Sequence, residues 1–257
     1  MKTATVILAA GKGKRMKNPE KSKVMYELAG KPLIEYVVNL ALKIKSEKII
    51  IVVGHQKKSV LEFINKKFNG KENPEFKKIY FAHQDKQLGT GHAVIKTKKY
   101  LGNYKGIVLI LSGDVPLLRE KTLNKFIEYH RENKFRASLI SAVMDNPSGY
   151  GRIIRDSQKN FTDIKEEKDT SEKQKKIKEI NSGIYLTDSK ILFEALKTLR
   201  KDNAQKEYYL TDVFKYFRKN GYKIGAFRIK DRNEISGINT LEQLVLMQKQ
   251  SGKIKQI

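Results

Sequence analysis

The fold is decided by one stretch near the start of the chain, Val6-Ile7-Leu8-Ala9-Ala10-Gly11-Lys12-Gly13-Lys14-Arg15-Met16. The β-branched, apolar run from Thr3 to Leu8 predicts a buried strand, because both of its faces are apolar. This run ends in small residues, two glycines and several cations. Glycines let a backbone approach a ligand and turn its N–H groups toward it. The stretch therefore predicts a nucleotide site at the carboxyl end of a strand.

Two basic residues are the candidates for contact with phosphate. Arg15 can bind phosphate oxygens through its planar fork, and Lys23 can bind them as a point charge. The spacing excludes two common phosphate loops. The Gly-Lys-Ser/Thr end of a P-loop is absent, and Met16 stands where the Rossmann fingerprint needs a third glycine. A glycine-rich turn without a ligand stays open on this stretch alone.

The composition is that of a folded protein with an unusual charge balance. The chain has 257 residues, enough for one α/β domain or one domain with an appendage, and its formal net charge is +25. Such a charge raises nucleic acid or an acidic membrane surface as a partner. The cations are mostly lysines spread along the whole chain. Proteins that bind nucleic acids more often gather arginine and aromatic residues on one face. We therefore interpret most lysines as a solvated surface and expect no specific nucleic-acid partner.

The absence of cysteine excludes disulfides and thiolate chemistry. The short apolar run after Met1-Lys2 leads into Gly-Lys-Gly-Lys-Arg rather than into a signal-peptide cleavage region. No other stretch approaches the ~20 apolar residues of a membrane span. We expect a cytoplasmic protein, either a monomer or a small homo-oligomer.

The first half of the chain alternates apolar runs with helical patterns. Strands are expected at 48–53, 79–82 and 107–111, and helices at 33–42, 59–68, 90–100 and 122–133. This alternation predicts an α/β fold with a doubly wound, mostly parallel Rossmann-like sheet, and ligands at the carboxyl ends of its strands.

In the second half of the chain, strands and helices no longer alternate regularly. Strands are expected at 137–144, 151–155, 161–164, 180–186 and 223–228, and helices at 189–199, 210–219 and 241–247. The charge-rich segment 165–178 is expected to form a loop with a short helix. The pattern predicts a smaller, more antiparallel lobe laid across the sheet. No hexapeptide repeat of the kind that builds a left-handed β-helix occurs.

Asp114 comes just after an expected strand, in Leu111-Ser112-Gly113-Asp114-Val115-Pro116. A carboxylate at the ligand edge of a sheet, beside a cationic loop, is suited to Mg²⁺, which favours few carboxylates plus substrate phosphates. A turn aspartate before Pro116 explains the same residue equally well.

Motifs along the whole chain resemble one family, the sugar-phosphate nucleotidyltransferases. The opening loop is similar to the signature loop of that family. The resemblance is closest to the uridylyltransferase half of the bacterial bifunctional N-acetylglucosamine-1-phosphate uridylyltransferase/glucosamine-1-phosphate acetyltransferases. The further matching stretches, in chain order, are Gln84, Gln87-Leu88-Gly89-Thr90-Gly91-His92-Ala93, Gly113-Asp114-Val115-Pro116, Gly149-Tyr150-Gly151-Arg152-Ile153, Glu166-Glu167-Lys168-Asp169, Glu179-Ile180-Asn181-Ser182-Gly183-Ile184, Asn203-Ala204-Gln205, Glu207-Tyr208-Tyr209-Leu210-Thr211-Asp212 and Gly237-Ile238-Asn239.

The resemblance implies one GT-A-like nucleotidyltransferase domain over residues 1–257. Its nucleotide-binding part is expected at about 1–135, its sugar-binding lobe at about 136–240 and a C-terminal helix at about 240–250, with no β-helix acetyltransferase domain. The implied reaction is Mg²⁺-dependent transfer of UMP from UTP to N-acetylglucosamine 1-phosphate. Its products are pyrophosphate and UDP-N-acetylglucosamine, a precursor of the peptidoglycan of the cell envelope.

The resemblance also implies roles for individual residues. Arg15 and Lys23 are implied to bind phosphates near the reacting centre, and Asp114 and Asn239 to hold Mg²⁺. The implied nucleotide contacts are Leu8, Ala9, Ala10, Gly11, Lys23, Gln84, Gly89, Thr90 and Gly113. The implied sugar contacts are Gly151, Glu166, Asn181 and Thr211.

The opening loop departs from the family pattern. Lys14 replaces the usual Thr, Ser22 replaces the usual Pro, and the loop between them is one residue longer. A loop without its proline has more conformational freedom. Lys23 is therefore expected to be less well preorganised, and Lys21 is a candidate for part of its role.

Two alternatives stay open at this point. One is the same chemistry on another hexose or amino-hexose 1-phosphate, or with another nucleotide, because many such enzymes share the fold. The other is a non-catalytic sugar-nucleotide or polyanion-binding protein. The histidines show no metal-ligand spacing, and we interpret His92 as structural.

Overall fold

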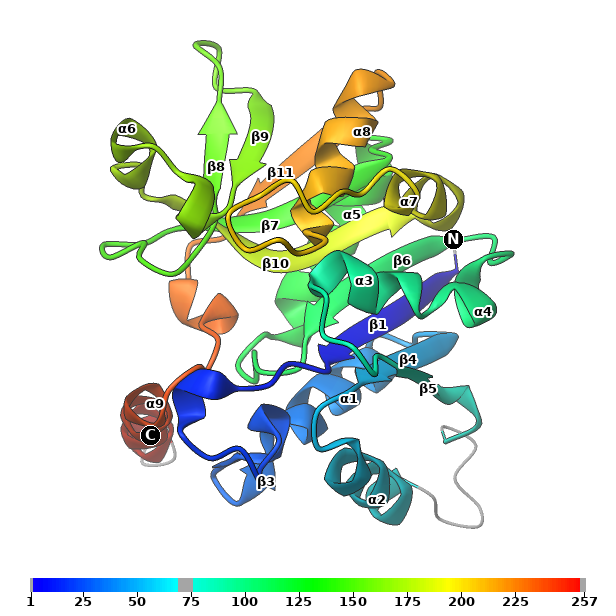
Figure 1. The fold of residues 1–257 in the computed structure, drawn as a ribbon, viewed down its shortest axis with the longest axis vertical. Helices are drawn as coiled ribbons and strands as arrows, with labels where there is room; N and C mark the ends of the chain where they lie inside the picture. Colours follow the sequence, from blue (N-terminus) through cyan, green and yellow to red (C-terminus); the bar gives the residue numbers. More distant parts are fainter. Residues whose placement is uncertain (1, 69–75, 255–257) are drawn as a thin grey trace.

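The computed structural model describes residues 2–68 and 76–254 of the chain (Figure 1). Within these residues the main sheet has nine strands, in the order β11-β7-β10-β6-β1-β4-β5, with β8 and β9 attached beside β10. The strands of this sheet are β1 (Thr3–Ala9), β4 (Lys48–Val53), β5 (Ile79–His83), β6 (Ile107–Ser112), β7 (Ala137–Val143), β8 (Arg152–Arg155), β9 (Phe161–Lys165), β10 (Glu179–Asp188) and β11 (Ile224–Arg228).

The helices surround this sheet. They are α1 (Leu33–Lys43), α2 (Lys57–Phe68), α3 (Thr90–Ile95), α4 (Lys98–Leu101), α5 (Glu120–Glu132), α6 (Glu172–Lys175), α7 (Ser189–Leu196), α8 (Val213–Lys219) and α9 (Leu241–Ile254). Short 3-10 helices lie at η1 (Lys14–Met16), η2 (Lys23–Met25), η3 (Phe76–Lys78), η4 (Glu167–Asp169), η5 (Leu210–Asp212) and η6 (Arg232–Ile235). None of the helices in this described part is long and apolar enough to cross a bilayer.

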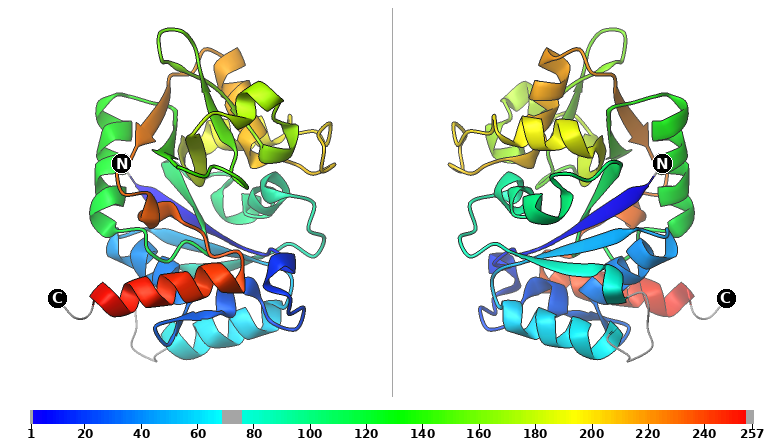
Figure 2. Two further views of the ribbon diagram at one scale, coloured as in Figure 1. Left: turned by 90° about the vertical axis from the view of Figure 1, so that its left-hand side faces the viewer. Right: turned by 90° about the vertical axis from the view of Figure 1, so that its right-hand side faces the viewer.

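Strand β1 shows why the sheet is covered on both faces. It pairs in parallel with β4 on one edge and β6 on the other, and β5 continues the parallel order beyond β4. Ile7 packs into the core formed with α1, α2 and α5, whereas Val6 packs into the core formed with α3, α4, α7 and α8. Figure 2 shows the sheet between these two helical layers. The predicted doubly wound, mostly parallel α/β fold is confirmed.

The second half of the chain contains the predicted smaller antiparallel part, but this part extends the main sheet rather than lying across it. Strand β10 pairs antiparallel with both β6 and β7, and thereby joins β7 and β11 to the parallel half. The antiparallel ribbon β8–β9 lies off the main path and meets β10 through Arg152. The antiparallel part is therefore a continuation of the sheet with a ribbon at one end.

Three predicted helices are shorter or less regular in the structure, two of them for the same physical reason. The helix expected at 90–100 is divided into α3 and α4, and the buried Thr97 hydroxyl at the break donates to the Val94 carbonyl. The helix expected at 189–199 ends at Leu196, and the Thr198 hydroxyl donates to Ala195. Such local bonds compete with helix continuation. The helix expected at 210–219 starts with a 3-10 turn, because the Leu210 N–H donates to the Thr90 hydroxyl on α3.

A small third core lies under the opening loop, and sequence reasoning did not predict it. The hairpin of β2 (Glu27–Leu28) and β3 (Lys31–Pro32) packs with α9 and with Ile238. Met16, buried in the same cluster, fastens the loop after β1 to this core. The segment that leads into α9 is therefore held beside the loop that carries Arg15.

Candidate active site

Four parallel strands end at the same level, and this sets the position of the candidate site. In the strand register Ala9 lies beside Val53, Val53 beside His83, and Leu8 beside Ser112. The residues that follow, Ala10, Gly54, Gln84 and Gly113, therefore lie in a row along the carboxyl edge. A cavity of about 920 Å³ opens there. It is lined by Leu8, Ala9, Ala10, Gly11, Lys12, Gly13, Arg15, Lys23, Val24, Gln84, Gln87, Gly89, Thr90, Ala93, Ser112, Asp114, Gly149, Glu166, Glu167, Lys168, Gln205 and Glu207.

The strand ends beside the cavity pack so closely that Gly54 has no room for a side chain. A Cβ at Gly54 would lie 2.8 Å from the Gln84 carbonyl oxygen and 2.9 Å from the Ala10 Cβ, closer than such atoms pack. The Gly113 N–H donates to the Leu8 carbonyl at 2.9 Å, which ties the β6 edge to the opening loop. The strand ends are therefore packed tightly against one another next to the cavity.

Arg15, Lys23, Asp114 and Asn239 meet at one end of the cavity. Lys23 Nζ forms an ion pair with Asp114 Oδ2 and donates to Asn239 Oδ1 at 3.1 Å. Arg15 donates to the same Asn239 oxygen at 2.8 Å. Side chains from three distant parts of the chain thus form one polar cluster.

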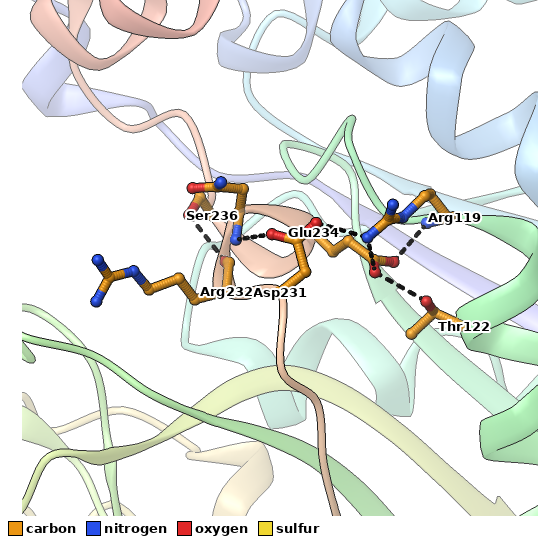
Figure 3. Close-up of polar contacts among 7 residues, drawn as sticks. Arg119, Thr122, Asp231, Arg232, Glu234 and Ser236 are labelled. Carbon is orange, nitrogen blue, oxygen red and sulfur yellow. Dashed lines mark hydrogen bonds and ion pairs between the residues drawn. The ribbon is translucent and has the colours of Figure 1, made fainter. Parts of the chain in front are cut away.

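A second polar cluster holds the segment that carries Asn239 (Figure 3). The buried Glu234 carboxylate accepts from the Arg119 guanidinium at 2.6 Å, from the Arg119 N–H at 3.0 Å and from the Thr122 hydroxyl at 2.9 Å. Arg119 also pairs with Asp231 at 2.5 Å. These contacts fasten η6 to the start of α5, and the Ile238 N–H donates to the Asp114 carbonyl. Asn239 is thereby placed opposite Asp114 by contacts outside the cavity.

The oxygens of Asp114 and Asn239 fit a divalent cation. One carboxylate and one amide oxygen converge on a single cationic nitrogen, that of Lys23. Mg²⁺ is typically held by one or two protein oxygens, with phosphates and water completing its coordination. Among the described residues no group of three histidine or acidic side chains is placed to hold a metal by itself. The donor set therefore suits a metal that arrives with a phosphorylated ligand.

Gln84 organises the side of the cavity expected to receive the nucleoside. Its buried amide nitrogen donates to the Gly89 carbonyl at 3.0 Å and lies 3.1 Å from His92 Nδ1. Burial lowers the pKa of His92. The contact between His92 and Gln84 is compatible with the structural role expected for this histidine.

The four residues expected to contact the sugar lie together. The Thr211 hydroxyl donates to Glu166 Oε1 at 2.9 Å, and the Asn181 N–H donates to the Gly151 carbonyl at 2.8 Å. Burial raises the pKa of Glu166, although the bond from Thr211 opposes this effect. A half-buried carboxylate with a raised pKa at a cavity wall is a common feature of functional sites. Glu166 lines the cavity, and Gly151, Asn181 and Thr211 lie behind it.

Several cavity residues were not among the predicted site residues. Lys12, Gln87 and Glu207 belong to matching motifs but had no assigned role, and their position in the cavity follows only from the fold. Glu167 forms an ion pair at 2.7 Å with Arg152, which is fully buried. The predicted residues that do not line the cavity are Gly113, Gly151, Asn181, Thr211 and Asn239. All of them except Asn181 lie against cavity residues, and Asn181 is bonded to Gly151.

The departures within the opening loop have different structural consequences. Lys21 lies over the ring of Tyr26 at 4.8 Å and, among the described residues, forms no ion pair with Asp114, so it does not share the position of Lys23. Ser22 is fully buried, and its hydroxyl has no hydrogen-bond partner within the described part of the chain. The side chain of Lys14 lies outside the described part.

Fold and site together define an α/β protein with a glycine-rich, cationic loop at the carboxyl end of β1, an arrangement typical of nucleotide-binding proteins. The family model for nucleotidyl transferases matches residues 4–233. The chain belongs to the nucleotidyl transferase family, which confirms the resemblance seen in its motifs.

Relatives and solved structures agree with this assignment. The chain is 45% identical over 243 residues to the bifunctional protein GlmU of Geotalea daltonii, covering 95% of this chain and 51% of the relative. It is 44% identical over 239 residues to GlmU of Acetivibrio thermocellus, covering 93% and 49%. The chain thus spans about half the length of these relatives. A UDP-glucose pyrophosphorylase complexed with UDP-glucose has the same fold, with a TM-score of 0.79, 20% identity and coverage of 98% of this chain and 99% of that one.

Ser22→Pro is expected to stabilise the protein. Ser22 has φ −60° and ψ 135°, which proline adopts without strain, and its N–H donates no hydrogen bond among the described residues. We expect a gain of ~0.4–1 kcal/mol in the free energy of unfolding from reduced freedom of the unfolded chain. Urea denaturation measures it. Ser22→Ala is the matched control, because it removes the unpaired hydroxyl alone. A proline variant no more stable than the alanine variant would contradict the expectation.

Glu166→Gln is expected to change the pH dependence of stability. Because burial raises the pKa of Glu166 in the folded state, its contribution to stability is complete below its unfolded pKa and is lost as pH rises through the folded value. The variant should therefore be more stable than the natural chain at neutral pH. The difference should vanish below about pH 4, where both side chains are neutral. Thermal unfolding across this range measures the effect, and a difference independent of pH argues against it.

Proposed function

We propose that this protein transfers UMP from UTP to N-acetylglucosamine 1-phosphate in a Mg²⁺-dependent reaction that releases pyrophosphate. The observation that carries the proposal is the convergence of Arg15, Lys23, Asp114 and Asn239 at the end of a cavity. The wall of this cavity contains Glu166, which accepts a hydrogen bond from the buried Thr211 behind it. Membership of the nucleotidyl transferase family and the similarity to GlmU proteins support it.

We propose a division of the cavity between the two substrates. Residues of about 1–135 would bind UTP, with its base near Gln84 and its phosphates along the backbone of Ala10 and Gly11. Residues of about 136–240 would bind the sugar through Gly151, Asn181 and the carboxylate of Glu166, which can accept hydrogen bonds from sugar hydroxyl or amide groups. The absence of cysteine and the use of UTP suit a cytoplasmic enzyme.

The chemistry requires positioning and charge stabilisation rather than a protein nucleophile. A phosphate oxygen of the sugar phosphate attacks the α-phosphorus of UTP, and the bond to pyrophosphate breaks. Both reactants are anions, so the approach is opposed by repulsion that Arg15 and Lys23 would offset. Mg²⁺, held by Asp114 and Asn239, would neutralise further charge on the triphosphate. Arg15 is exposed to the cavity, and its bond to Asn239 orients its guanidinium.

A substrate panel tests the proposed reaction. Purified protein is incubated with Mg²⁺, each of the common nucleoside triphosphates and a set of sugar 1-phosphates, and pyrophosphate release is measured. We expect the fastest release with UTP and N-acetylglucosamine 1-phosphate. Release with no pair would contradict an enzymatic function. Release with another sugar or nucleotide alone would move the proposal to that substrate.

Two variants test the assigned roles. Arg15→Ala should lower kcat by roughly 10²–10³-fold, because a positioned charge near the reacting phosphate is lost. Asp114→Ala should raise the Mg²⁺ concentration needed for half-maximal turnover. Near-normal turnover of Asp114→Ala at limiting Mg²⁺ would remove Asp114 from the metal site. Lys168→Ala, which removes another cation from the cavity wall, is the control for a general loss of positive charge.

A further inference from the structure

The amino group of Lys23 occupies the position expected for a metal. It pairs with Asp114 Oδ2, and it lies 3.1 Å from Asn239 Oδ1. Both partners of the ion pair are largely shielded from solvent, with side-chain exposures of 19% for Lys23 and 12% for Asp114. A shielded pair of this kind is only weakly screened by salt. Lys23 is therefore a strong local competitor for these oxygens.

The amide oxygen of Asn239 is also occupied by hydrogen bonds. Asn239 Oδ1 accepts from Arg15 at 2.8 Å as well as from Lys23. A divalent ion bound to Asp114 and Asn239 would lie close to the Lys23 ammonium, and the two positive charges would repel each other. Lys23 in this position and a bound metal are therefore mutually exclusive.

The loop allows the Lys23 side chain to move while its backbone stays in place. Val24 is buried beside it in the main core, which fixes η2 against the sheet. Gly13, with φ +59°, faces the stem of Lys23, and a Cβ at Gly13 would lie 3.0 Å from the Lys23 Cβ. Without a side chain there, the lysine stem, which has four rotatable bonds, keeps room to change rotamer.

We propose that Lys23 exchanges between two partners: the metal ligands Asp114 and Asn239 in the ligand-free protein, and phosphate oxygens once a metal-bound triphosphate enters. This inference rests on the metal ligands of the proposed function and adds a second role for Lys23. The consequence is that the free protein binds a divalent metal weakly, and that metal and nucleotide bind together. Lys23 is thus a positioning residue for the metal ligands before it contacts substrate.

The test is Mn²⁺ binding to the ligand-free protein, measured by electron paramagnetic resonance of the free ion. Lys23→Met removes the ammonium and keeps the apolar stem. We expect it to bind Mn²⁺ about tenfold more tightly than the natural chain, because its carboxylate no longer has a resident cation. Lys12→Met is the matched control. It removes a cation that lines the same cavity but, within the described part of the chain, forms no ion pair with Asp114. The Mn²⁺ affinity of this variant should therefore change less than about twofold.

The double variant Lys23→Met/Asp114→Asn tests whether the tighter Mn²⁺ binding depends on the carboxylate of Asp114. It should lose the tighter binding, because the freed carboxylate is absent. Equal Mn²⁺ affinity of Lys23→Met and the natural chain would overturn the proposal, as would a gain that survives in the double variant or appears equally in Lys12→Met. If Lys23→Met does not fold, as judged by circular dichroism, Lys23→Gln serves for the same comparison. The titration uses no substrate, so its failure is distinguishable from an inactive substrate panel.

Discussion

Hydrogen bonding of β1 to parallel strands on both of its edges is the constraint on which the site depends. The register with β4 and β6, and of β4 with β5, makes four strands end at one level. Loops from distant parts of the sequence then begin side by side, and short or missing side chains at Ala10, Gly54 and Gly113 let them pack closely. Parallel pairing thus places the loops after four strands side by side at one edge of the sheet, where a phosphorylated ligand can contact all of them.

The site is assembled from charges that are balanced against one another in the absence of substrate. Lys23 pairs with Asp114, and both Lys23 and Arg15 donate to Asn239, so the cations needed to offset phosphate repulsion already lie near the expected reacting centre. Their partners are held in turn from outside the cavity, since Glu234 and Arg119 fasten the segment before Asn239 to α5 (Figure 3). Preorganised charge of this kind is costly to assemble during folding but effective in catalysis of phosphoryl-type transfer.

The sequence was sufficient to predict the fold of the first half, because continuous apolar runs and intervening helical patterns have few other interpretations. It was less informative where contacts between distant residues decide the outcome. The ends of α3 near Thr97 and of α7 near Thr198 each depend on one hydrogen bond from a threonine hydroxyl. The pairing of β10 with β6 joins strands that are far apart in the sequence. For the site, motifs located Arg15, Asp114 and Asn239, but no pattern could predict that Lys23 would lie between the latter two. The assigned roles of these residues stay predictions.

The most direct measurement is the anomalous scattering of Mn²⁺ in crystals grown with a non-hydrolysable UTP analogue. The account predicts a peak between the oxygens of Asp114 and Asn239, with the triphosphate along the loop after β1 and the Lys23 ammonium moved from Asp114 to a phosphate oxygen. A metal peak elsewhere, or Lys23 still paired with Asp114 beside a bound metal, would contradict the account.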